Sequence, residues 1–186
     1  MKEDSVTDIQ DAIRAITIWQ PWATLLATGE KRFETRPWAT RYTGPIAIHA
    51  GRDFRKEVQM IAERSGFCDL LERHGFAPDK YPRGELAGLP LGAIVGVGWM
   101  KRCVKTEDIV EEMFARSEEG SMLERDQIEV RLGDFHRGRF GFEIVNVTLL
   151  AEPIVCAGAQ RLWRLDCRLE AAMRGMIDVD ALGGVE

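Results

Sequence analysis

Five segments of the chain predict β-strands, because their apolar residues are β-branched, alternate with polar residues or form a continuous run. The segments are 15–18, 32–36, 45–50, 91–104 and 138–152. Side chains alternate between the two faces of a strand, so Ile46 and Ile48 are expected on one face and His49 on the other. The segment 91–104 is almost continuously apolar, which is typical of a strand buried on both faces.

Helical spacing of apolar residues predicts a brief helix after Pro21. Trp22, Leu25 and Leu26 share one face of it, and Gly29 stands where a left-handed C-terminal cap is usual. Proline suits the first turn of a helix because its missing N–H group would have no partner there.

Longer helices are predicted over 52–65 and 107–116, from Ser121 onward, and after Asp166. Thr106 is the expected N-cap of the second of these helices. Ser121 and Glu124 have the spacing of a capping box, and Asp166 is expected to cap the last helix.

Strands and helices do not alternate regularly enough for a doubly wound parallel sheet. The predicted fold class is therefore α+β, a small mixed or antiparallel β-barrel flanked by helices. We expect a core domain over 14–165 with helical insertions near 52–75 and 106–131. It follows a tail or short helix over 1–13 and precedes a C-terminal helix and tail over 166–186.

Composition favours one globular domain, since the chain has 186 residues and is 45% hydrophobic. No apolar run approaches the ~20 residues of a membrane helix, and the N-terminal segment lacks the apolar core of a signal peptide. A cytoplasmic protein without a membrane partner is expected. Its four cysteines have no CxxC spacing, so the sequence indicates no metal site, no disulfide framework and no cofactor.

Basic and aromatic residues are concentrated between residues 14 and 56. This stretch has eight Lys or Arg against three Asp or Glu, a local charge of +5 in a chain of net charge −5. Its tryptophans are Trp19, Trp22 and Trp38. A basic, aromatic patch on an acidic body favours selective binding of a short single strand or a nucleotide over coating of duplex DNA. Alternatively, the long basic side chains only solvate strand faces.

Two blocks of residues carry a more specific signal. The first comprises Gln20, Pro21, Trp22, Gly29, Lys31, Glu34, Arg36, Trp38, Arg41, Gly44, Ile46, Ile48, His49 and Ala50. The second comprises 92–97, 132–135, 140–146, 153–154 and 158–163. Together they resemble the ASCH domain, the activating signal cointegrator homology domain of the PUA-like superfamily. The resemblance implies a PUA-like β-barrel.

It also implies that the ligand is RNA, a nucleotide or a modified nucleoside. The candidate ligand-binding residues are Gln20, Trp22, Lys31, Glu34, Arg36, Trp38, Arg41 and His49. Either Trp22 or Trp38 can stack on a base. Arg36 and Arg41 can hold a phosphate or a base edge, and Gln20 can read a Watson–Crick edge. The sequence leaves the oligomeric state open.

An enzyme at the same cleft is the alternative function, with Lys31 and Glu34 as its catalytic residues. Some ASCH proteins resemble ribonucleases, and some resemble amidohydrolases that deacetylate N4-acetylcytidine. The amidohydrolases use a lysine, a threonine three residues later and a glutamate elsewhere; here Lys31 matches, Glu34 stands three residues on, and Thr35 follows it. Two other readings stay open: a Lys31–Glu34 surface ion pair and an aromatic patch that binds a partner protein.

Overall fold

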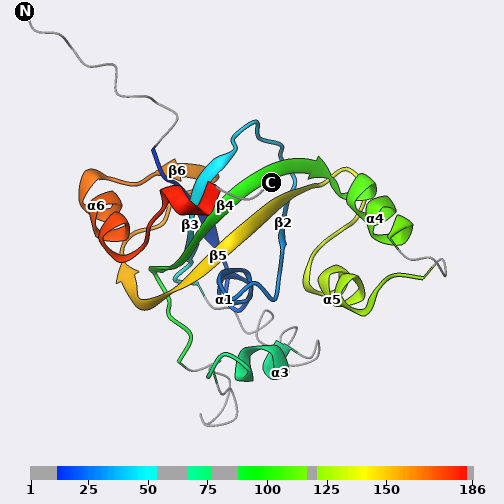
Figure 1. Ribbon diagram of the computed structural model, residues 1–186, viewed down its shortest axis with the longest axis horizontal. Coiled ribbons are helices and arrows are strands. Elements are labelled where there is room, and N and C mark those ends of the chain that lie inside the picture. The colour runs from blue at the N-terminus through cyan, green and yellow to red at the C-terminus, as the bar shows by residue number, and fades with distance from the viewer. Residues whose placement is uncertain (1–11, 54–66, 77–87, 117–120, 184–186) are drawn as a thin grey trace, which may run out of the picture.

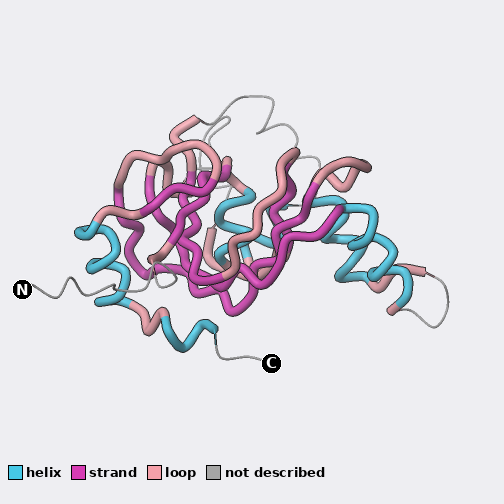
Figure 2. The backbone as a smooth tube through the Cα atoms, turned by 90° about the horizontal axis from the view of Figure 1, so that it is seen from above, coloured by secondary structure: helices cyan, strands magenta, loops and turns pink. Residues whose placement is uncertain are grey.

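One mixed β-sheet forms the centre of the computed structural model, which describes residues 12–53, 67–76, 88–116 and 121–183. Its strands are β1 (Arg14–Ile18), β2 (Phe33–Arg36), β3 (Gly44–Ala50), β4 (Ala93–Lys105), β5 (Phe140–Val155) and β6 (Leu162–Arg164). They lie in the order β2-β5-β4-β3-β1-β6. β1 and β3 are parallel, and the other neighbouring pairs are antiparallel. The sheet curls into a half-barrel, which confirms the predicted α+β class (Figure 2).

Helices pack against this sheet and lie at both of its ends. They are α1 (Trp22–Ala27), α3 (Phe67–Glu72), α4 (Thr106–Ala115), α5 (Glu124–Leu132), α6 (Cys167–Met176) and the 3-10 helix η2 (Asp180–Gly183). Helices α4 and α5 lie together at one end of the molecule, and α6 lies at the other (Figure 1). Among the described residues, no helix has both the length and the apolar character needed to cross a membrane.

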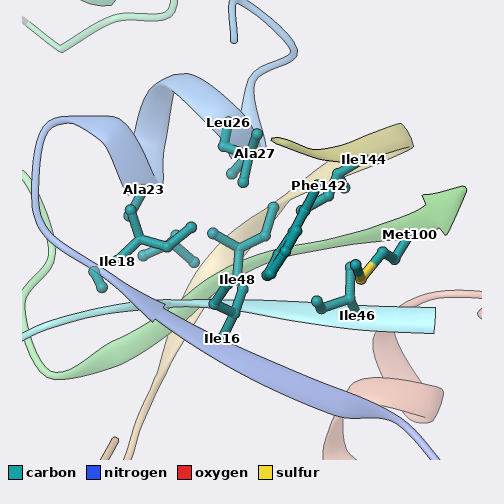
Figure 3. Packing of buried hydrophobic residues seen from close by; sticks show 12 residues of the cluster. Ile16, Ile18, Ala23, Leu26, Ala27, Ile46, Ile48, Met100, Phe142 and Ile144 are labelled. Carbon is teal, nitrogen blue, oxygen red and sulfur yellow. The ribbon is translucent and has the colours of Figure 1, made fainter. Parts of the chain in front are cut away.

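The main core lies between α1 and the concave arrangement of strands (Figure 3). Ile46 and Ile48 both point into it and are fully buried, so the face predicted for them is confirmed. The alternate residue Ala47 belongs to a second core on the opposite face, where Met173 of α6 packs. Both faces of the central strands are therefore covered, which explains why residues 93–100 of β4 are all apolar.

Two glycines allow α1 to sit where it does. Gly29 has φ +79°, the left-handed conformation expected of it, and lies just after the end of the helix. Gly96 of β4 faces α1 so closely that a Cβ atom there would lie 2.6 Å from the Ala27 Cβ atom. The missing side chain at Gly96 thus brings helix and sheet into direct contact.

Two helix starts and one strand end differ from the sequence prediction. Thr106 is the first residue of α4, not its N-cap, and its hydroxyl donates to the carbonyl of His136 at 2.7 Å. Helix α5 begins at Glu124 without a side-chain cap, so the capping box with Ser121 is wrong. β5 continues through Pro153, because the register with β4 is irregular there. The Asp166 cap is confirmed, since its carboxylate accepts from the N–H groups of Arg168 and Leu169.

Two predicted segments fall mainly outside the described residues. The helix predicted over 52–65 overlaps the described chain only at 52–53, and the N-terminal segment 1–13 only at 12–13. The remaining parts of these segments stay predictions.

Candidate functional site: a basic pocket at β2

A pocket of about 390 Å³ lies where the β1–α1 turn, the start of β2 and the α5–β5 loop meet. Trp19 and Trp22 supply its aromatic surface. Its charged lining residues are Lys31, Glu34, Arg36, Arg131, Asp134 and Arg139. Four basic and two acidic side chains therefore surround a space of the size that holds a small ligand.

Lys31 is the most unusual of these residues because its side chain is only 1% exposed. The chain leaves α1 at Gly29, and the Lys31 N–H group donates to the Leu25 carbonyl at 3.0 Å, which fixes the backbone below the pocket. The Lys31 Nζ atom lies 3.7 Å from a Glu34 oxygen and 4.0 Å from a Glu129 oxygen. It makes no hydrogen bond within the described part of the chain.

Glu129 joins α5 to the pocket although it lies 97 residues after Arg32. One of its carboxylate oxygens accepts the Arg32 N–H group at 2.8 Å, and the other accepts the Phe33 N–H group at 3.0 Å. Asp126, one helical turn earlier, pairs with the Arg32 guanidinium group. These bonds provide acceptors for the two backbone N–H groups at the start of β2, and they hold α5 against that strand.

Glu34 and Arg36 share the pocket face of β2, in agreement with the strand alternation. The Arg36 Nε atom lies 3.0 Å from a Glu34 oxygen, and a second Arg36 nitrogen donates to the Thr17 carbonyl at 2.6 Å. The pair therefore links β2 to the end of β1, and Glu34 lies between two cationic groups, Lys31 and Arg36.

Thr35 also lines the pocket, although it is adjacent to Glu34 in the strand. Its hydroxyl oxygen accepts the N–H group of Asp134 at 3.1 Å, so its own proton remains available to a ligand. Arg139 donates to the Thr35 carbonyl at 3.2 Å and lies 3.1 Å from an Asp134 oxygen. The pKa of Asp134 is lowered, chiefly by its hydrogen bond with His136 and also by the Arg139 charge.

The structure brings Trp22, Lys31, Glu34 and Arg36 together, and it places the other predicted residues elsewhere. Gln20 is fully buried; its amide group bonds to Thr24 and to the Pro90 carbonyl at 2.9 Å. It therefore holds the start of α1 instead of lining the pocket. Arg41 is exposed and lines none of the described pockets.

Trp38 is half-buried in the main core. Its ring packs edge-on against Phe142 with centroids 4.9 Å apart, and the Arg161 guanidinium carbon lies 5.6 Å from its centroid. This tryptophan thus already has an aromatic and a cationic neighbour. Trp19, and not Trp38, lines the basic pocket, and 46% of the Trp19 surface is exposed.

His49 lies in another pocket, of about 340 Å³. Its Nε2 atom is 3.2 Å from the Cys156 carbonyl oxygen. The pKa of His49 is lowered, because burial disfavours the charged ring and the nearby Arg52 charge adds to the effect.

Sequence reasoning missed the residues contributed by α5 and the loop after it. Arg131, Asp134 and Arg139 lie about 100 residues from Lys31 in the chain, so no local pattern connects them to the motif. Within the described ranges, no group of three His, Cys, Asp or Glu residues is arranged to hold a metal ion.

Comparisons with known proteins identify one family. A protein-family model described as the ASCH domain matches residues 16–121. The crystal structure of ASCH from Zymomonas mobilis is 13% identical, with a TM-score of 0.48, over 89% of this chain and 95% of that chain. A structure of a point mutant of the Zymomonas mobilis protein gives the same identity and TM-score and is covered over 98% of its length. No curated protein matches the sequence.

Proposed function

Because the chain belongs to the ASCH domain family, we propose that its basic pocket recognises a nucleotide unit of single-stranded RNA or a modified nucleoside. The observation that carries this proposal is the Lys31 ammonium group. It is buried at the pocket and makes no hydrogen bond within the described part of the chain. A buried ammonium group is stabilised by hydrogen-bond acceptors, and a base carbonyl or phosphate oxygen supplies one.

The surroundings of Lys31 suit the same ligand. Trp19 and Trp22 present aromatic surface on which a base can stack, and Arg36 and Arg131 lie at the same pocket. The net charge of the chain is −5, so attraction to a phosphate has to come from this local group of cations. Such a pocket selects a short ligand and gives little nonspecific binding.

Among the residues expected to bind the ligand, we assign four to direct contact in this pocket: Trp22, Lys31, Glu34 and Arg36. Glu34 supplies an acceptor for an exocyclic amino group, since its carboxylate lies at the pocket beside Lys31. Gln20 acts as a positioning residue through its bonds at the start of α1.

The proposal is tested by fluorescence anisotropy with labelled mixed-sequence RNA hexamers and by calorimetry with N4-acetylcytidine. We expect Lys31→Met to weaken binding of the accepted ligand at least tenfold. Arg131→Ala, at an exposed position, is expected to weaken hexamer binding two- to fivefold and to lower its salt slope by about 0.7. Lys101→Met is the matched control, because Lys101 is exposed and lines none of the described pockets.

Folding of each variant is checked by thermal unfolding, since Lys31 is buried and Arg131 is not. If Arg131→Ala and Lys31→Met fold and bind like the Lys101→Met control, the pocket is not the binding site. If the wild-type protein binds neither ligand, a protein-interaction role for the aromatic surface replaces the proposal.

A hydrolase at this pocket is the second candidate function, and the placement of Thr35 favours it. Thr35 lines the same pocket as Lys31 and Glu34 even though it stands one residue beyond the position expected of an amidohydrolase threonine. A lysine ammonium group can stabilise the negative charge that develops on an oxygen during hydrolysis, and a carboxylate beside it can accept a proton from a hydroxyl group or water. Lys31 has this arrangement with Glu34 and Glu129.

The two functions separate in one assay. Product formed from N4-acetylcytidine or from RNA, and lost in Lys31→Met but only reduced in Arg131→Ala, would establish an enzyme. Binding without product in the wild-type protein would leave recognition as the function.

A further inference from the structure

The pocket that contains His49 adjoins the basic pocket. Thr17 lines both of them. Trp19 lines the first, and its ring lies against Gly51, which lines the second; a Cβ atom on Gly51 would be 3.4 Å from the Trp19 Cδ1 atom. An exposed tryptophan therefore stands between two hollows, each of which is large enough for part of a nucleotide.

The second pocket offers a cation. Arg52 is exposed at its edge and forms no ion pair within the residues that the structure describes. Its side chain extends along Gly92, where a Cβ atom would meet the Arg52 Cγ atom at 2.7 Å. A guanidinium group held in this way is suited to a phosphate oxygen.

The same pocket offers a buried hydrogen-bond acceptor. The Cys156 carbonyl can only accept, so the His49 Nε2 atom facing it carries the ring proton. Nδ1 then has a lone pair, and no described residue bonds to it although His49 is 1% exposed. An acceptor of this kind is satisfied by a ligand that brings an O–H or N–H group.

Gly158 packs against this edge of the ring, and its missing side chain allows the two to lie so close. A Cβ atom at Gly158 would lie 2.7 Å from both His49 Nδ1 and Thr17 Oγ1, so only hydrogen atoms can occupy the position. Thr17 Oγ1 accepts the Trp163 indole N–H group at 3.2 Å, which fixes the threonine beside the histidine. Gly158 lies in an exposed segment that lines the same pocket, and a ligand hydroxyl group reaches Nδ1 only when the Gly158 backbone moves away from it.

We propose that this second pocket binds the sugar and phosphate of the adjoining nucleotide of a single-stranded RNA that crosses Trp19. Arg52 pairs with the phosphate, and His49 Nδ1 accepts a hydrogen bond from the ribose 2′-hydroxyl group. This inference rests on the proposed function and deepens it, because it makes the ligand a strand of at least two ribonucleotides and not a free nucleoside. DNA lacks the donor that His49 requires.

The experiment compares three ligands by fluorescence anisotropy and competition: mixed-sequence RNA hexamers, DNA hexamers of the same base composition, and uridine monophosphate. We expect the wild-type protein to prefer RNA hexamers to both others. Arg52→Ala should weaken RNA hexamer binding two- to fivefold, lower its salt slope by about 0.7 and leave uridine monophosphate binding unchanged. His49→Phe should bring the RNA and DNA affinities together.

Arg168→Ala is the matched control, since Arg168 is an exposed arginine of α6 that lines none of the described pockets. Arg52 is also exposed, so its loss is not expected to unfold the protein. Equal effects of Arg52→Ala and Arg168→Ala, or a preference for DNA hexamers, would overturn the second subsite and leave the first pocket in place. Absence of binding by the wild-type protein to all three ligands would overturn the second subsite, and would overturn the first pocket as well if N4-acetylcytidine also fails to bind.

Discussion

The Lys31 Nζ atom lies 3.7 Å from a carboxylate oxygen of Glu34, and both side chains line the same pocket. The sequence also allowed a solvated surface ion pair between them, but a lysine side chain that is 1% exposed excludes it. At this distance the two charges attract each other without forming a hydrogen bond. The ammonium group is therefore held in place and still has hydrogen atoms to donate to a ligand.

Glu129 is predicted to be the side chain of α5 that matters most for stability. Glu129→Ala would leave the Arg32 and Phe33 N–H groups without their acceptor, and Lys31 with one carboxylate fewer. We expect the free energy of unfolding to fall by about 3 kcal/mol. Urea denaturation measures it, with the exposed Arg125→Ala in the same helix as a control expected within about 0.5 kcal/mol of wild type. A loss below 1 kcal/mol for Glu129→Ala would contradict the assigned role.

Two glycine substitutions are predicted to have opposite effects, because only Gly96 lies at the contact between α1 and β4. Gly96→Ala places a methyl group 2.6 Å from the Ala27 Cβ atom and 2.9 Å from the Thr148 carbonyl oxygen. We expect it to lower the midpoint of thermal unfolding, with a cost of about 1–3 kcal/mol. Gly175→Ala, in α6, meets no atom within 4 Å and should stabilise the protein by ~0.5–1 kcal/mol. Equal shifts for the two variants would show that helix and sheet are not in close contact.

His49 predicts a loss of stability in weak acid. Burial lowers the pKa of His49 below its ordinary value of 6.5 in the folded protein. Below pH 6.5 the unfolded chain thus binds a proton that the folded chain does not, and the free energy of unfolding decreases as the pH falls. It should be constant with respect to this group above that range. Urea denaturation between pH 8 and pH 5.5 measures the slope, which should be smaller in His49→Gln. A slope that is unchanged in this variant would assign the acid sensitivity to other groups.

The N-cap of α6 gives a further stability prediction. The Asp166 carboxylate accepts the N–H groups of Arg168 and Leu169, each at 2.9 Å. Asp166→Ala should therefore cost about 1 kcal/mol. Ser121→Ala should cost nothing measurable, because α5 starts at Glu124 without a side-chain cap. Urea denaturation measures both variants, and a costly Ser121→Ala would favour the capping box that the spacing predicts.

Local patterns predicted the parts of the fold that depend on neighbouring residues. The shared face of Ile46 and Ile48 follows from strand alternation, and the Gly29 and Asp166 caps follow from the preferences of single positions. Thr106 was predicted wrongly because a threonine near a helix start can also bond elsewhere. Its hydroxyl group bonds to the His136 carbonyl, 30 residues away.

Half of the pocket could not be predicted from the sequence for a similar reason. Lys31, Glu34 and Arg36 belong to one motif, whereas Glu129 and Arg131 reach them only through the packing of α5 on β2. The composition of α5 does not reveal which of its carboxylates are buried, because the helix is mostly charged and its sequence does not distinguish a buried carboxylate from a solvated one. Only contacts between distant segments distinguish the two.

The bonds from Glu129 to the start of β2 also affect how this protein can be divided. The ASCH family model ends at residue 121, before α5 begins. A fragment cut at that boundary would keep the first block of ASCH-like residues but would expose the Arg32 and Phe33 N–H groups and lose the side of the pocket that carries Arg131. The smallest fragment that retains the pocket must therefore extend past α5 and through β5, the strand with which β2 pairs.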